Sequence, residues 1–174
     1  MQAHIPSAAT VGDVTSNARG SGARYNANKA PMDLIPLWVV ANSFADKATH
    51  DDNLEPVQKA LYHLGRFQTT HDVAELDKAI DWLSHRWFSC ARVFDYGRRK
   101  YAEWNWAKGM AWSVPLACAA RHALAILDLD ETLDSESNEA HEGHFMCNLV
   151  MLRTFYDSFK SGNDLPPPEM FAPL

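Results

Sequence analysis

The apolar residues of the chain recur mainly three and four positions apart, the spacing of amphipathic helices. Helical patterns are predicted over residues 32–48, 53–67, 71–101, 112–129 and 139–159. No run of alternating β-branched residues is long enough to indicate a sheet. The pattern therefore predicts an all-α fold, an antiparallel helical bundle of four or five helices.

Polar residues and prolines suggest where the helices begin. The first helix is expected to start near Asp33, because Pro36 is tolerated only in a first turn. Asp72 has the position of an N-cap, and Ser137 or Asn138 could cap the last helix.

One domain is expected, since 174 residues with 47% hydrophobic content bury one sizeable core. Residues 1–23 are rich in small polar residues and are predicted to be a flexible N-terminal arm. Residues 24–160 then form a single helical domain. Residues 161–174 contain three consecutive prolines and are predicted to be an extended, proline-rich tail.

Composition narrows the range of partners. Sixteen Lys and Arg against 22 Asp and Glu leave a net charge of -6, which opposes binding to a nucleic-acid polymer but not to a small anion. The sequence shows neither a secretory signal pattern nor a membrane-spanning run. Three scattered cysteines fit reduced thiols, so we expect a cytoplasmic protein that binds no membrane.

The densest cluster of chemically capable residues lies in the second half of the chain. Glu131 and Asp134 are three residues apart, so a helix continuing through them would place both carboxylates on one side. His141, His144 and Asn148 form a stripe on the next helix. Carboxylates suit Mg²⁺ or Mn²⁺, and the histidines favour Mn²⁺ or a softer metal, which could polarise a phosphate. The alternative is that these residues only solvate a loop and cap a helix.

Cations and aromatic residues suggest how an anionic ligand could be bound. Arg121 and His122 interrupt an apolar helix, so the guanidinium must reach solvent or pair with a phosphate or with Asp128. Further along, Lys100 could contact phosphates, and Asn105 with the neighbouring tryptophans could bind a base. For Trp104 alone, a core or interface position is favoured. A shorter piece places Arg24, Asn26 and Lys29 in a loop ahead of the first helix.

These pieces occur as three motifs: R-x-N-x-x-K-x-P at 24–31, K-Y-x-x-x-N-W at 100–106, and R-H with E-x-x-D and H-x-x-H within 121–148. In this order they resemble the phage MazZ-type dATP/dGTP diphosphohydrolases, relatives of the all-α MazG and HisE nucleotide pyrophosphohydrolases. The resemblance implies metal-dependent hydrolysis of dGTP and dATP to the monophosphate and pyrophosphate. It also implies supply of dGMP for 2-aminoadenine nucleotide synthesis, depletion of dATP in a phage-infected cell, and a homo-oligomer (dimer or tetramer).

The resemblance also implies roles for individual residues. Catalytic roles fall to Glu131, Asp134 and His122. Substrate binding falls to Arg24, Asn26, Lys29, Lys100, Asn105, Trp106 and Arg121. Metal binding, with Mg²⁺ or Mn²⁺ as cofactor, falls to Glu131, Asp134, His141, His144 and Asn148. Because many relatives run almost directly from the first helix to the K-Y segment, residues from about 46 to 85 are expected to be a helical insertion.

Two other functions are compatible with the sequence. The dipeptides His50-Asp51 and His71-Asp72 suggest an HD-type phosphohydrolase, which would release triphosphate instead. A non-catalytic helical assembly protein would use the apolar faces, the six tryptophans and the proline-rich tail as oligomer contacts.

Overall fold

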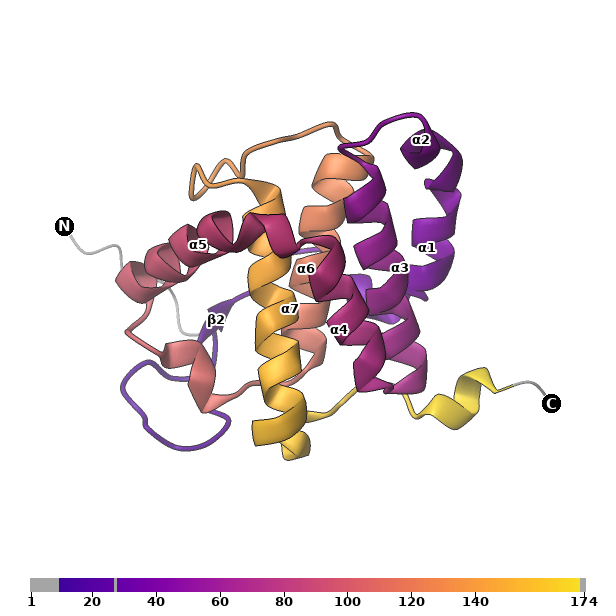
Figure 1. Ribbon diagram of the computed structural model, residues 1–174. Helices are drawn as coiled ribbons and strands as arrows, with labels where there is room; N and C mark the ends of the chain where they lie inside the picture. The colour runs from indigo at the N-terminus through magenta and orange to yellow at the C-terminus, as the bar shows by residue number, and fades with distance from the viewer. Residues whose placement is uncertain (1–9, 27, 173–174) are drawn as a thin grey trace.

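Seven α-helices make up most of the described residues, 10–26 and 28–172, of the computed structural model (Figure 1). They are α1 (Leu37–Ser43), α2 (Ala45–Thr49), α3 (Glu55–Thr70), α4 (Val73–Trp82), α5 (Trp87–Lys100), α6 (Ser113–Leu127) and α7 (His141–Ser158). Single 3-10 turns are η2 (Met32–Leu34), η3 (Ser84–Arg86), η4 (Asn105–Lys108), η5 (Lys160–Gly162) and η6 (Pro168–Phe171). Two antiparallel strands, β1 (Thr10–Val11) and β2 (Arg24–Tyr25), have only two residues each. The predicted all-α class is confirmed.

Helix α7 lies at the centre of the fold. It packs against α4, α5 and α6, and α5 crosses it (Figure 1). On its other side the bundle continues through α3, which contacts α1, α4 and α6. The core centres on Phe67, Phe145 and Phe155, all fully buried, each contributing roughly 1.5–3 kcal/mol by burial. Of the helices in the described ranges, none is long and apolar enough to cross a membrane.

The prediction of one continuous helix over residues 32–48 is wrong, because this segment is divided into η2, α1 and α2. Pro36 is the N-cap of α1 rather than a residue of its first turn, and Ile35 before it is extended at φ -119° and ψ 146°. The buried side chain of Gln68 compensates for this break. Its Oε1 accepts a 3.0 Å hydrogen bond from the Leu37 N–H, and its Nε2 donates to the Ile35 carbonyl.

The long helix predicted over residues 71–101 is also divided, into α4 and α5, with η3 between them. His71 has a left-handed backbone (φ 56°) that ends α3. Asp72 is confirmed as the N-cap of α4, accepting a 3.0 Å bond from the Ala74 N–H. The predicted helices that correspond to α3, α6 and α7 are confirmed, with ends that differ by at most three residues.

Two glycines allow neighbouring helices to approach closely. A Cβ at Gly65 of α3 would lie 2.0 Å from the backbone nitrogen of Trp38 in α1. A Cβ at Gly143 of α7 would lie 2.4 Å from the Ser89 hydroxyl of α5. The second approach fixes the first turn of α7 against α5.

The described part of the predicted N-terminal arm runs along η4. The Gly20 N–H donates to the Lys108 carbonyl at 2.8 Å, and the Gly22 N–H donates to the Gly109 carbonyl at 2.9 Å. Residues 1–9 of that prediction lie outside the described residues. These bonds join the segment before β2 to the chain that leads into α6.

The proline-rich tail is not extended throughout. Leu165 is buried against the core, and residues 168–171 form the 3-10 turn η6 with Pro168 at its start. Proline is tolerated there because the first residue of a helical turn needs no N–H donor. Residues 173–174 lie outside the described part of the tail.

Candidate functional site

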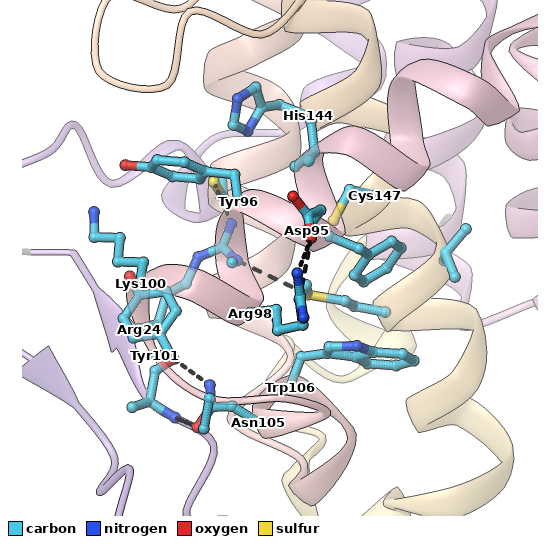
Figure 2. Close-up of a pocket in the computed structure, with 18 of the residues that line it drawn as sticks. Arg24, Asp95, Tyr96, Arg98, Lys100, Tyr101, Asn105, Trp106, His144 and Cys147 are labelled. Atoms are coloured by element: carbon cyan, nitrogen blue, oxygen red, sulfur yellow. Dashed lines mark hydrogen bonds and ion pairs between the residues drawn. The ribbon is translucent and has the colours of Figure 1, made fainter.

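A cavity of about 530 Å³ lies beside the central helix α7 (Figure 2). Its walls come from β2, α5, η4, α6, α7 and the α6–α7 loop (residues 128–140). Four cations line it: Arg24, Lys29, Arg98 and Lys100. Four carboxylates line it as well: Asp95, Glu103, Asp134 and Glu136. The cavity therefore offers cations for a small anionic ligand and carboxylates for a metal ion.

Three histidines lie together at the end of the cavity nearest the α6–α7 loop. The Nδ1 atoms of His122 and His141 are 2.8 Å apart, and the rings of His122 and His144 stack at a centroid distance of 4.3 Å. Asp134 completes the cluster, since one donor atom each from His122, Asp134 and His141 all lie within 4.8 Å of one another. We name these four residues the histidine–aspartate cluster. The predicted stripe of His141 and His144 on one helix is confirmed by α7.

The protonation states of the histidine–aspartate cluster suit metal binding. Burial and the neighbouring His122 lower the pKa of His144 to about 3, and they also lower the pKa of His141. Burial raises the pKa of Asp134, but hydrogen bonds from the Ser137 N–H and hydroxyl outweigh it and lower the pKa overall. At neutral pH His141 and His144 therefore offer neutral imidazole nitrogens and Asp134 offers a carboxylate, the forms that bind cations.

The α6–α7 loop, rather than a helix, places Asp134. Helix α6 ends at Leu127, so the prediction that Glu131 and Asp134 project from one side of a helix is wrong. Ser137 positions the carboxylate: its hydroxyl donates to Asp134 Oδ2 at 2.8 Å and lies 2.7 Å from His144 Nε2. Ser137 is thus engaged within the loop and does not cap α7.

Helix α7 begins without a side-chain cap, so neither residue predicted to cap it does so. Its N-cap is Ala140, which has an extended backbone. Asn138 is left-handed at φ 59°, a conformation that asparagine tolerates. The loop is instead held by backbone bonds, including one from the His141 N–H to the Thr132 carbonyl at 3.0 Å.

Glu131 approaches the histidine–aspartate cluster from the opposite side. Its Oε2 is 3.4 Å from His141 Nε2, and it lines a separate cavity of about 330 Å³ with Arg86 and Glu142. Asp134, in contrast, lines the larger cavity. The two predicted carboxylates therefore flank His141 instead of standing side by side.

Asn148 was predicted to bind the metal, but its amide does not point toward the histidine–aspartate cluster. Its Oδ1 accepts a 2.9 Å hydrogen bond from Arg24 Nη2, and its Nδ2 donates to the His144 carbonyl at 2.7 Å. Asn148 is fully buried and holds the Arg24 guanidinium in the cavity wall.

Cys118 is the second partner of Arg24, at 2.9 Å from Nη2 to Sγ. Burial raises the pKa of the Cys118 thiol, but the Arg24 guanidinium and the His122 imidazole lower it by more, leaving it well below its ordinary value. No carboxylate is bonded to Arg24 in the described chain. A buried guanidinium without a carboxylate partner is a favourable contact for an anionic or strongly polar ligand.

Two predicted substrate-binding residues, Asn26 and Arg121, pair with each other. Arg121 Nη2 donates to Asn26 Oδ1 at 2.8 Å, and Nη1 donates to the Ala30 carbonyl at 2.9 Å. Neither residue is among those lining the larger cavity in the described chain. The predicted partner Asp128 is exposed beyond the end of α6, so Arg121 secures the loop before η2 instead.

Asn105 has a structural role in place of the predicted base contact. Its Oδ1 accepts from the Ala23 N–H at 3.1 Å, and its Nδ2 donates to the Ala23 carbonyl at 2.9 Å. Because both ends of the buried amide are used, Asn105 positions the strand that carries Arg24. Asn105 therefore shapes the cavity without being free to read a base.

Aromatic side chains form the wall of the cavity near η4. The rings of Phe94 and Trp106 are 5.1 Å apart, and those of Trp104 and Trp106 are 6.0 Å apart. Trp104 is 67% exposed and has a left-handed backbone at φ 56°, which is unfavourable for a large side chain. This geometry places an exposed indole at the edge of the cavity, so the core position predicted for Trp104 is wrong, and the interface position stays a prediction.

Several residues of the site were missed by the sequence reasoning. Tyr96, Phe94, Cys118 and Glu136 line the larger cavity. Tyr96 lies four residues before Lys100 on the same predicted helix, so helical spacing could have shown that the two side chains share one face. Helical spacing could not have identified Glu136, because this residue lies in a loop.

The two His-Asp dipeptides lie outside the larger cavity. His71 Nε2 contacts the Pro166 carbonyl at 3.1 Å, Asp72 caps α4, and the Thr49 hydroxyl is 3.0 Å from His50 Nδ1. Within the described ranges, the one group of residues close enough to hold a metal contains neither dipeptide. These positions do not favour the HD-type alternative.

The helical fold and its cavity, which is lined by cations and carboxylates, define an all-α protein with a site for a charged ligand. A sequence model of the family described as dATP/dGTP diphosphohydrolase, N-terminal, matches residues 78–165, half of the chain. The chain belongs to this family and is a nucleoside triphosphate diphosphohydrolase. No curated protein and no solved structure matches it.

The matched segment includes α5, η4, α6 and α7, which supply most of the cavity wall. Arg24 and Lys29 lie before it in the chain. The resemblance expected from the motifs is thus confirmed at the level of the dATP/dGTP diphosphohydrolases.

Proposed function

We propose that the enzyme hydrolyses dGTP and dATP between the α and β phosphates, releasing the monophosphate and pyrophosphate, with Mg²⁺ or Mn²⁺ bound at the histidine–aspartate cluster. The observation that carries the proposal is the grouping of His122, Asp134 and His141 donor atoms within 4.8 Å, beside a cavity lined by cations. Such a metal, when bound, supplies Lewis-acid polarisation of a phosphate and a more acidic water.

The residues present fit a divalent cation. The Nδ1 atoms of His122 and His141 lie 2.8 Å apart, so a cation beside them could be bound by both imidazoles. The other ring nitrogen of His141, Nε2, faces Glu131 Oε2 at 3.4 Å and is buried without a hydrogen-bond partner among the described residues. Two imidazoles with one carboxylate favour Mn²⁺ over Mg²⁺, which prefers oxygen donors.

The remaining cavity residues then bind the two ends of the substrate. Lys29 and Lys100 line the cavity and both face Glu136, and their ammonium groups suit the phosphates. Trp104 and Trp106 suit the purine, because indoles stack on any base. In this arrangement the α phosphate lies between the lysines and the histidine–aspartate cluster.

The wider role completes the proposal: supply of dGMP for 2-aminoadenine nucleotide synthesis and removal of dATP in the cytoplasm of a phage-infected cell. The motif resemblance supports it, as does a family description that names both purine substrates. We also propose a homo-oligomer, a dimer or tetramer. The exposed Trp87 and Phe88 at the start of α5 support this, since such a pair is favoured at interfaces.

A product assay tests the reaction. The protein is incubated with dGTP, dATP, dCTP or dTTP and Mn²⁺ or Mg²⁺, and the products are separated by ion-exchange chromatography. Turnover of dGTP and dATP to the monophosphate and pyrophosphate, abolished by a chelator, is expected. Release of triphosphate would favour the HD-type reaction, and no turnover of any substrate would favour a non-catalytic assembly protein.

Trp104→Ala is expected to raise the KM for dGTP by about ten- to a hundredfold with little change in kcat, because base stacking on an aromatic residue contributes about 1–3 kcal/mol. Trp104→Phe retains a stacking face and is expected to stay close to wild type. Steady-state kinetics with dGTP measures both variants.

Trp87→Ala is the matched control, since Trp87 is 51% exposed on α5 but does not line the cavity within the described chain. A KM that rises equally for Trp87→Ala and Trp104→Ala would contradict the assignment of the base to Trp104. An unchanged KM for Trp104→Ala would contradict it as well.

A further inference from the structure

The cavity contains a carboxylate of the chain itself, bonded to the groups that suit a phosphate. Glu136 Oε1 forms an ion pair with Lys100 and accepts a 3.0 Å hydrogen bond from the Tyr96 hydroxyl. Its Oε2 lies 3.9 Å from Lys29 Nζ. All four residues line the larger cavity, and Figure 2 shows Tyr96 and Lys100 close together on α5. Both oxygens of Glu136 therefore face cationic or hydroxyl donors.

These donors match a phosphate as well as they match a carboxylate. Ammonium and phenol groups donate to any anionic oxygen, and a polyphosphate brings more charge and more acceptor atoms than one glutamate. Glu136 is also about half exposed, on a loop rather than a helix, so it can leave without disturbing the core.

We propose that Lys29, Tyr96 and Lys100 form a phosphate subsite that Glu136 occupies in the absence of ligand, and that a polyphosphate must displace Glu136 in order to bind. The proposal rests on the proposed function only for the identity of the natural ligand. Glu136 thus lowers the affinity of the cavity for the substrate triphosphate and for the pyrophosphate product alike.

This competition has a use in the catalytic cycle. Glu136 follows Asp134 by two residues, and Ser137 next to it is bonded to the Asp134 carboxylate. The carboxylate that competes with pyrophosphate therefore lies in the same loop as Asp134 of the histidine–aspartate cluster. Its return to the two lysines favours product release.

Binding of inorganic tripolyphosphate and pyrophosphate tests the proposal without any turnover. The full chain is titrated by isothermal calorimetry in the presence of a chelator, as wild type and as Glu136→Gln. The variant is expected to bind both anions about tenfold more tightly, the change expected when a competing charged hydrogen bond is lost. Glu136→Ala is measured in parallel, and melting curves of both variants show whether they fold.

Asp77→Asn is the matched control, because Asp77 is also an ion-paired carboxylate, but neither it nor its partner Arg153 is among the described residues that line the cavity. It removes the same charge and is expected to change the affinity less than twofold. When Lys100 is also replaced by Met, Glu136→Gln is expected to give no increase in affinity for either anion.

Three outcomes would overturn the proposal: unchanged or weaker anion binding by both Glu136 variants, equal gains from Asp77→Asn, or a gain in anion affinity that persists without Lys100. Loss of the proposed reaction is a separate result. If dGTP yields no pyrophosphate, the proposed function fails, whereas the binding of inorganic anions still decides the role of Glu136.

Discussion

Asp134→Asn is expected to lower kcat for dGTP about a hundred- to a thousandfold. The histidine–aspartate cluster has one carboxylate that lines the larger cavity, and asparagine keeps the shape but removes the negative charge that a divalent cation needs. The asparagine oxygen can still accept from Ser137, so the α6–α7 loop is expected to keep its structure. Rates measured across a range of Mn²⁺ concentrations should show partial recovery at high concentrations.

Glu131→Gln is the informative comparison. Glu131 faces His141 from the smaller cavity, so it is expected to orient the imidazole and not to contact the substrate. Replacing Glu131 should lower kcat for dGTP about ten- to a hundredfold, as for other residues that orient a metal ligand. If kcat of Asp134→Asn stayed near the wild-type value, or if Glu131→Gln lost more activity, the metal site would have to lie on the Glu131 side of His141.

Gly65→Ala is expected to lower the free energy of unfolding by about 3 kcal/mol, and the melting temperature by roughly 6–12 °C. The added methyl group would overlap the backbone of α1 at Trp38 and Leu37, at 2.0 and 2.6 Å, and backbone cannot rotate away as a side chain can. Differential scanning calorimetry in a chelating buffer measures the change in both quantities.

Gly97→Ala provides the opposite case. It lies in α5 with nothing within 4 Å of an added Cβ, so the substitution is expected to stabilise the helix by about 0.5–1 kcal/mol. If Gly65→Ala melted at the wild-type temperature, the close approach of α3 and α1 would be incorrect.

The helices could be predicted from the sequence because apolar periodicity directly reports which face of a helix is buried. Helix α7 illustrates this: His141 and His144 are three residues apart and do face one site. The breaks at Pro36 and after Trp82 were missed, because apolar spacing continues across a short turn. The pattern records which residues are buried, not where the backbone changes direction.

The site was predicted less completely, since hydrogen-bond partners far apart in the sequence are not visible in spacing. Asn105 was expected to contact a base, yet Ala23, 82 residues away, uses both ends of its amide. Arg121 was expected near phosphates, yet it reaches Asn26. A polar residue can be recognised as capable of binding from the sequence, but which group it binds is decided by the fold.

The bonds from Arg24 to Asn148 and from Asn105 to Ala23 span 124 and 82 residues of sequence. Closing such long segments costs conformational entropy, which contacts between adjacent helices largely avoid. We therefore expect the helices to assemble while residues before η2 are still unattached, and the wall that carries Arg24 and Lys29 to join afterwards. In that order of folding, the proposed ability to bind polyphosphate is the last property that the chain acquires.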